Sequence, residues 1–254
     1  MDRVYPFGRP VTPRAPSASG KRALFVLGAY PSALYVEWTP PAPWQPVQAI
    51  AVDDEPTPFW DGRGQAALVA AWRERVSFNP AWGVAGDTPR FNGSSGAWVH
   101  ERVLAVLGVA AADTCVSDCL DTYRVSRGAA ARIDDTYAPF ASTAGLTPAH
   151  LDAHPSEDEI VDEALRLHSA RLIRELSACA PEIVVTLGNA ALRVARELID
   201  GANAAPRRLR PDRSYGTAVD VRISGRATRL IPLAHPAAPA AYQAAQAAWR
   251  VAST

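Results

Sequence analysis

Two short apolar segments that each end in a glycine constrain the fold of this chain most strongly. Residues 23–28 have the sequence ALFVLG, and residues 182–188 have the sequence EIVVTLG. Apolar runs of this length are typical of parallel β-strands that helices cover on both faces. Residues 190–199, which follow the second run, carry apolar residues at helical spacing. Together these segments predict an α/β fold with a mainly parallel sheet.

Further strands and helices alternate along the rest of the chain. Additional strands are predicted at residues 47–52 and 113–120, with two more around Ser224-Gly225. Helices are predicted at residues 64–76, at 96–108, from a Ser156 cap to Pro181, and near the C-terminus. We therefore expect residues 21–254 to form one three-layer α/β/α domain. Its core is predicted to be a central, mainly parallel four-stranded sheet with short edge strands.

Two segments lack these patterns. Residues 1–20 contain four prolines and little periodicity, so an extended N-terminal arm is expected. Residues 121–155 are rich in Arg, Asp and Pro, and we interpret them as a long polar loop. A loop of that length inside a compact domain is usually functional or flexible.

The composition excludes few partners. The formal net charge is zero, which neither suggests nor excludes nucleic acid, because a local basic face is enough to bind phosphate. No apolar run approaches the roughly 20 residues that span a bilayer, and the N-terminus lacks the apolar core of a signal peptide. We therefore expect a cytoplasmic protein without a membrane partner. The three cysteines, Cys115, Cys119 and Cys179, are too few for a four-thiolate metal site and are expected to be buried thiols.

Four predicted strand ends carry the candidate site residues. In open α/β sheets, ligands bind beyond the carboxyl ends of the strands. This rule selects the loop at residues 28–32, Asp118, the Gly188-Asn189 turn and the loop at His235. The sequence therefore predicts one pocket at this edge of the sheet.

In their order along the chain, these strand ends resemble the motifs of the uracil-DNA glycosylase superfamily. The matching segments are a Gly-x-x-Pro-small loop at residues 28–32, a polar strand end at Asp118, the LGNAAL turn at 187–192, and a His-Pro-small motif at 235–237. The resemblance covers roughly residues 22 to 250. It implies a parallel sheet flanked by helices and an enzyme that hydrolyses the bond between a base and deoxyribose after the nucleotide is flipped out of DNA. The reaction would use water without a metal or organic cofactor, and we expect a monomer that binds DNA.

The resemblance implies that two residues contact the leaving base. His235 would donate a hydrogen bond to the base O2, where negative charge accumulates as the bond breaks. The alternative for His235 is a loop histidine that caps the last helix. Asp118 would read the base at a position where most of the family has asparagine. An ionised aspartate only accepts hydrogen bonds, so it suits the N4 amino group of cytosine better than O4 of uracil. A structural role for Asp118, or a shift of the match toward Asp121, remains an alternative.

Ser32 also favours a cytosine-type base as the substrate. It stands where the uracil-specific branch has a tyrosine that closes the pocket against substituents at the pyrimidine C5. The smaller side chain leaves space there, so a C5-modified cytosine is the predicted substrate. Because such bases occur in phage genomes, an antiphage role is a reasonable hypothesis. The alternatives are a repair glycosylase for uracil or another deaminated base, an inactive DNA-binding protein on the same fold, and a nucleotide hydrolase.

The water-activating group of the family is missing from its usual place, where this chain has Ala29 and Tyr30. Candidate replacements are Glu37 and the acidic run at residues 53–55. We predict Asp53 or Asp54 as the catalytic carboxylate, since strand ends converge on the pocket; a solvated acidic turn is the alternative. Tyr30 is also predicted to stack on the base, in place of the usual aromatic.

The remaining assignments concern binding. Gly28, Ala29 and Pro31 would shape the base pocket together with Tyr30 and Ser32. Phosphate contacts must come from arginines, because Lys21 is the only lysine. The predicted DNA-binding residues are Arg124, Arg127, Arg207, Arg208, Arg210, Asn189, Pro236 and Ala237. A solvated charged face is the alternative for the arginine groups.

Overall fold

A five-stranded, mostly parallel sheet forms the centre of the protein. The computed structural model describes residues 2–253 and the side chains up to residue 250. The strand order is β5-β1-β6-β8-β7, and the first four strands run parallel to one another while β7 pairs antiparallel with β8. The strands are β1 (Leu24–Gly28), β5 (Thr114–Asp118), β6 (Ile183–Leu187), β7 (Val219–Ile223) and β8 (Arg226–Leu233). The predicted α/β class is confirmed, and the sheet has five strands rather than four.

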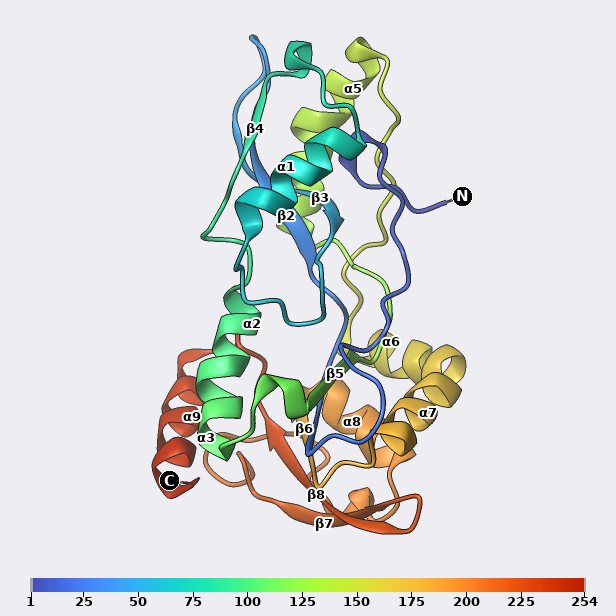
Figure 1. Cartoon of the computed structure of the whole chain (residues 1–254), viewed down its shortest axis with the longest axis vertical. Helices are drawn as coiled ribbons and strands as arrows, with labels where there is room; N and C mark the ends of the chain where they lie inside the picture. Colours follow the sequence, from blue (N-terminus) through green and yellow to red (C-terminus); the bar gives the residue numbers. More distant parts are fainter. Residues whose placement is uncertain (1, 254) are drawn as a thin grey trace.

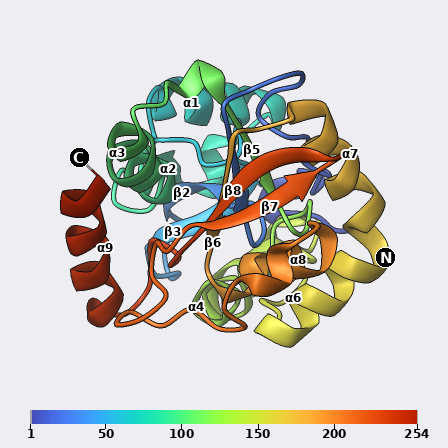
Figure 2. The ribbon, with the colours of Figure 1, turned by 90° about the horizontal axis from the view of Figure 1, so that it is seen from below.

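Helices cover both faces of this sheet, as Figures 1 and 2 show. Alternate residues of β1 point to opposite faces, since Phe25 and Leu27 join one core while Leu24 and Val26 join the other. The first face is covered by α6 (Glu157–Glu163), α7 (Ser169–Cys179) and α8 (Asn189–Leu198). The second is covered by α2 (Ser94–Val99), α3 (Ala105–Leu107) and α9 (Ala240–Ser253).

Several predicted helices are confirmed, and two of them are interrupted by π-helical segments. A π-helical segment, η3 (His100–Leu104), joins α2 to α3, and η6 (Ala164–His168) joins α6 to α7. Ser156 and Glu159 form a capping box at the start of α6. Among residues 2–253, no helix is both long enough and apolar enough to cross a membrane.

A second, antiparallel sheet has its own core and was not predicted. Its strand order is β3-β2-β4. The strands are β2 (Ala33–Thr39), β3 (Val47–Asp54) and β4 (Val84–Gly86). Figure 1 shows this sheet above the parallel one, with α1 (Gln65–Arg75) and α5 (Ala138–Ala144) beside it. Trp38, Trp72 and Phe140 are buried in its core.

The prediction of a long loop at 121–155 is wrong. This segment contains α4 (Arg127–Arg132), the π-helical η5 (Ile133–Tyr137) and α5. Its buried residues Ala129, Ile133, Tyr137 and Ala141 recur every fourth position, which is the spacing of one helix face. Polar residues between them obscured that pattern in the sequence.

The N-terminal arm is extended, as expected, and it is packed against the rest of the chain. Tyr5 is fully buried, and Phe7 lies within the short 3₁₀ turn η1 (Pro6–Gly8) in the core of the second sheet. The Phe7 N–H donates to the Tyr137 hydroxyl at 2.7 Å. Further along the arm, the Ser17 N–H donates to the Val116 carbonyl at 2.8 Å. The arm therefore contacts both the second sheet and β5. Other short 3₁₀ turns are η2 (Pro80–Trp82), η4 (Ala111–Asp113) and η7 (Ala202–Ala204).

Candidate functional site

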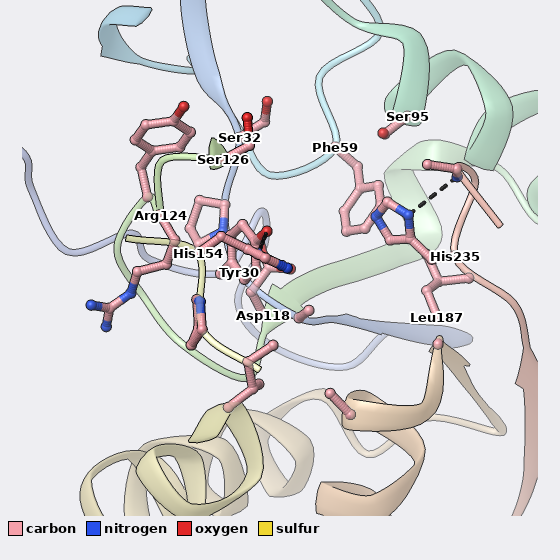
Figure 3. Close-up of a pocket in the computed structure, with 18 of the residues that line it drawn as sticks. Tyr30, Ser32, Phe59, Ser95, Asp118, Arg124, Ser126, His154, Leu187 and His235 are labelled. Carbon is pink, nitrogen blue, oxygen red and sulfur yellow. Dashed lines mark hydrogen bonds between the residues drawn. The ribbon is translucent and has the colours of Figure 1, made fainter. Parts of the chain in front are cut away.

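A cavity of about 590 Å³ lies at the carboxyl ends of the parallel strands. All four predicted strand ends reach it, through the loop at residues 29–32, Asp118, the turn at 187–190 and His235. Figure 3 shows side chains from these segments around one space. The rest of the wall includes Tyr35 of β2, Glu55 and Phe59 after β3, and Tyr123 and Ser126 between β5 and α4.

Asp118 is the last residue of β5, and its side chain is buried at the cavity wall. Its Oδ1 atom has no hydrogen-bond partner among the described residues. Burial raises the pKa of this carboxyl well above its usual value, and the charge of Glu55 raises it further. The protein therefore favours the protonated form of Asp118, which can both donate and accept a hydrogen bond.

Gly28 makes room for this carboxyl. A Cβ atom at Gly28 would lie 2.1 Å from Oδ1 of Asp118 and 2.8 Å from the ring of Phe59. The two side chains thus meet over the bare backbone of β1, where β1 and β5 place Gly28 and Asp118 opposite each other. A glycine is required here because of this close approach.

Arg171 on α7 fixes the end of β5. Its Nη2 atom donates to the backbone oxygens of Asp118 and Cys119 at 2.8 and 3.0 Å, and its Nη1 atom donates to the Ser117 hydroxyl at 3.1 Å. Glu175 pairs with the same guanidinium at 3.0 Å. The backbone that carries Asp118 is therefore held from the helix layer.

Glu55 follows β3 directly and also lies at the cavity wall, with only 5% of its surface exposed. Its Oε1 atom accepts the backbone N–H of Ser32 at 3.2 Å. Burial raises its pKa to about 7, although backbone N–H groups and the charge of Arg14 act in the opposite direction. A carboxyl that is half ionised near neutral pH is suited to accept a proton during a reaction.

The structure does not bring Asp53 or Asp54 to the cavity, which corrects the predicted catalytic carboxylates. Asp53 pairs with Arg75 at 2.8 Å and with Arg9 at 3.2 Å. Asp54 accepts the Tyr5 hydroxyl at 2.9 Å and also bonds to Thr12. The prediction selected the wrong carboxylates of this strand end, because Asp53 and Asp54 are bound by the N-terminal arm and by α1, whereas the next residue, Glu55, reaches the cavity. The other candidate, Glu37, is exposed on β2 outside the cavity wall.

His235 follows β8 and lines the cavity. Its Nδ1 atom accepts the backbone N–H of Ala237 at 3.2 Å, the bond drawn in Figure 3. In the neutral ring this bond assigns the proton to Nε2, which is left to donate. The residue is partly open to solvent, yet the protein around the ring lowers its pKa by removing water from the charged form. His235 is thus a neutral hydrogen-bond donor at physiological pH.

Tyr30 and Phe59 are two of the aromatic side chains that line the cavity wall. The Tyr30 hydroxyl is hydrogen-bonded to Nδ1 of His154, and the two rings are 5.6 Å apart. Burial raises the pKa of Tyr30 to about 12, so it is not a base at neutral pH. Phe59 was missed at the sequence level because it lies in a proline-rich turn rather than in a strand. Its ring reaches the Gly28 backbone, and it is a candidate for stacking on a bound base beside Tyr30.

The predicted arginines divide into paired and unpaired groups. Arg124 is buried and forms ion pairs with Asp152 and Glu163, so it is not free to bind phosphate, which corrects its assignment. Four others are exposed and lie outside the cavity wall: Arg127, Arg207, Arg208 and Arg210.

The basic loop at residues 207–213 is tied to the cavity wall. The Asn189 side chain accepts the backbone N–H of Leu209 at 2.8 Å, and the Tyr242 hydroxyl donates to the Leu209 oxygen at 2.9 Å. Asn189 therefore links the loop to the turn after β6. Ala237 lines the cavity, whereas the Pro236 carbonyl accepts a hydrogen bond from Gln243.

The chain matches no protein-family model, and no curated protein matches it. Within the described residues, no group of three or more His, Cys, Asp or Glu side chains is placed to hold a metal ion. The site is therefore defined by its own geometry, as a strand-end cavity with two buried carboxyls and a neutral histidine.

Proposed function

We propose that this protein is a DNA glycosylase of the uracil-DNA glycosylase superfamily. It would hydrolyse the N-glycosidic bond of a flipped-out cytosine-type base that carries a C5 substituent, and would leave an abasic site. The observation that carries the proposal is the presence of Glu55, Asp118 and His235 on the wall of one cavity. Hydrolysis of this bond needs a proton acceptor for water and hydrogen-bond or proton donors for the departing base.

Each of the three groups has one step in the proposed reaction. Ionised Glu55 takes a proton from water as the water oxygen bonds to C1′ of the sugar. The C1′–N1 bond breaks, and its electron pair moves onto the base. Asp118 gives its proton to N3, and the Nε2–H of His235 donates to O2. The products are the neutral base and a sugar hydroxyl, and exchange with solvent returns the proton from Glu55 to Asp118.

The hydrogen-bonding pattern of Asp118 supports a cytosine-type base. A protonated carboxyl presents one O–H donor and one carbonyl acceptor, which match N3 and the N4 amino group of cytosine. The cavity volume of about 590 Å³ lies in the range that holds drug-sized ligands, which is more than a bare pyrimidine needs. Ser32 lines the same cavity, so the added volume supports a substituted base.

Uracil is the second candidate substrate. The same protonated carboxyl can accept from N3–H and donate to O4 of uracil, and the raised pKa of Asp118 favours that form. The variant Asp118→Asn separates the two, because an amide pairs with uracil but has no proton to give to N3. We expect Asp118→Asn to keep or gain release of uracil while losing release of the modified cytosine.

The proposed partner is DNA, and the exposed arginines of the 207–213 loop support it. Their tie to Asn189 holds positive charge next to the wall of the cavity. If the substrate is a modified cytosine of phage DNA, the protein acts in antiviral defence. Cells that express it would then resist phages with modified cytosine and remain sensitive to phages with ordinary cytosine.

The direct test uses oligonucleotides with one defined base. Single- and double-stranded DNA containing cytosine, 5-methylcytosine, 5-hydroxymethylcytosine or uracil is incubated with the protein. Hot alkali then cleaves abasic sites, and mass spectrometry identifies the released base. We expect release of a C5-substituted cytosine and no release of plain cytosine. Absence of base release from every substrate, with protein in excess, would overturn the proposal.

A further inference from the structure

The N-terminal arm passes alongside β5, the strand that ends in Asp118. The Arg14 N–H donates to the Asp121 carbonyl at 2.6 Å, and the Ser17 N–H donates to the Val116 carbonyl at 2.8 Å. The Val116 N–H in turn donates to the Ser17 hydroxyl at 2.8 Å. Residues 14–17 therefore run antiparallel to residues 116–121 and pass alongside Asp118.

Arg14 is an unusual residue within this arm. Its Nε atom is buried and has no hydrogen-bond partner, and within the described chain its guanidinium forms no ion pair at salt-bridge distance. Its charge acts on Glu55 and on Asp118. The Oδ1 atom of Asp118 is likewise buried and unpartnered. Arg14 and Asp118 thus each contain a buried polar atom without an internal hydrogen-bond partner, and the charge of Arg14 acts on both cavity carboxyls.

The other charges around this cluster do not replace Arg14. Arg171 also faces Asp118, but Glu175 pairs with it at 3.0 Å, and Glu175 itself raises the pKa of Asp118. Arg14 is thus the cation acting on both carboxyls that has no carboxylate partner of its own among residues 2–253. Two carboxyls that share a site with little water resist double ionisation, and a nearby cation favours the ionisation of one of them.

We propose that Arg14 is a positioning residue of the site, which the N-terminal arm delivers so that its charge keeps the Glu55–Asp118 pair singly ionised. One carboxyl can then accept a proton while the other still holds one to donate. The arm is in that case a functional part of the site rather than a tether. This inference rests on the proposed glycosylase reaction for its catalytic meaning, but the charge relation can be measured without catalysis.

The first experiment follows the rate of base release from pH 5.5 to 9 in Arg14→Gln, Arg14→Lys and Arg9→Gln. Arg9 is the matched control, because it lies on the same arm but its cation pairs with Asp53 outside the cavity. We expect the acid limb of the Arg14→Gln profile to move upward by about one pH unit, with the rate restored above pH 8. Arg14→Lys and Arg9→Gln should keep the wild-type profile.

Two outcomes would overturn the inference. The first is an unchanged profile in Arg14→Gln. The second is an equal loss of rate at every pH in Arg14→Gln and Arg14→Lys, since a purely structural role would produce that pattern. Thermal unfolding of each variant verifies that the compared proteins are folded.

The second experiment reads the carboxyl directly. Carboxyl ¹³C NMR of glutamate-labelled protein, with the Glu55 signal assigned by its loss in Glu55→Gln, gives the titration midpoint of Glu55. We expect the midpoint to rise in Arg14→Gln and to stay unchanged in Arg9→Gln. If it rises but the wild type releases no base, the glycosylase proposal fails and the role of Arg14 stands. If the wild type releases base but the midpoint does not move, the role of Arg14 alone is refuted.

Discussion

Asp53 and Glu55 are two residues apart at the end of β3, and their environments differ completely. Both residues are 5% exposed. Asp53 lies between the cations of Arg9 and Arg75, at 3.2 and 2.8 Å. Glu55 accepts backbone N–H groups instead, and its carboxyl forms no ion pair at salt-bridge distance within the described residues. The first carboxylate holds the arm and α1 to β3, whereas the second is left available to the cavity.

The difference shows that burial alone does not identify a functional carboxyl. Two arginines compensate the buried charge of Asp53, so it serves the fold. The charge of Glu55 is only partly compensated, so its pKa rises to about 7 and the group becomes able to exchange a proton near neutral pH. The partners of a carboxyl therefore separate the two roles more sharply than its position in the sequence does.

The largest effect is expected on the rate of base release, which should distinguish Glu55 from Asp53. Glu55→Gln removes the proposed proton acceptor and should lower the rate of base release about 10³-fold. Asp53→Asn should leave the rate of the folded protein within a few-fold of wild type, because Asp53 does not reach the cavity. Single-turnover assays at 25 °C measure both, with circular dichroism as the control for folding. Equal losses in the two variants would remove the distinction between the carboxyls.

Substitutions of Glu55 and Asp53 should change the free energy of unfolding in opposite directions. The pKa of Glu55 rises from 4.5 to about 7 on folding, which at about 1.4 kcal/mol per unit costs the folded state about 3 kcal/mol above pH 7. This cost is absent near pH 4, where the carboxyl is protonated in both states. Glu55→Gln should therefore raise the free energy of unfolding at pH 8 by up to about 3 kcal/mol and change little at pH 4.

Asp53→Asn should instead destabilise the protein by about 3 kcal/mol at pH 8, because it leaves two arginines without their shared partner. Urea unfolding at both pH values measures each change. Destabilisation of the protein by Glu55→Gln at pH 8 would contradict the environment described for that residue.

A smaller effect is expected when one glycine in each of the two sheets is replaced by alanine. Gly28→Ala places a Cβ atom 2.1 Å from Oδ1 of Asp118, so the carboxyl or the strand must move. Gly86 at the end of β4 has no atom within 4 Å of the same added Cβ. We expect Gly28→Ala to cost about 1–3 kcal/mol and most of the activity, and Gly86→Ala to be nearly neutral. Thermal unfolding and base release measure both, and equal tolerance of the two would contradict the crowding at Gly28.

The sequence allowed the parallel sheet and its strand ends to be predicted, but not the second sheet or its share of the cavity. Apolar runs such as residues 23–28 identify buried strands directly, and strand-end geometry then brings Asp118 and His235 together. Glu55 and Phe59 reach the cavity only because an antiparallel sheet packs over those strand ends. That packing depends on long-range contacts, which local periodicity does not encode. The assignment of Arg124 to DNA binding was wrong for a related reason, since its carboxylate partners lie 28 and 39 residues further along the chain.

The smallest effect is expected for arginines, which, like the carboxyls, differ in whether they have an ion-pair partner. Arg124 is bound to two carboxylates, whereas Arg207, Arg208 and Arg210 are exposed and form no ion pair at salt-bridge distance within residues 2–253. Replacing these three with glutamine should weaken DNA binding and lower its dependence on salt. Each lost phosphate contact reduces the slope of log K against log salt by about 0.9 on duplex DNA.

The control for this variant is Arg226→Gln, since Arg226 is also exposed but begins β8 at the end opposite His235. Fluorescence anisotropy with a labelled duplex at several salt concentrations gives the slopes. The triple variant should bind more weakly at low salt while keeping the wild-type rate of base release at saturating protein, because none of the three arginines lines the cavity. A slope equal to that of wild type would show that the unpaired arginines are a solvated face, and the DNA would then have to approach the cavity from another side.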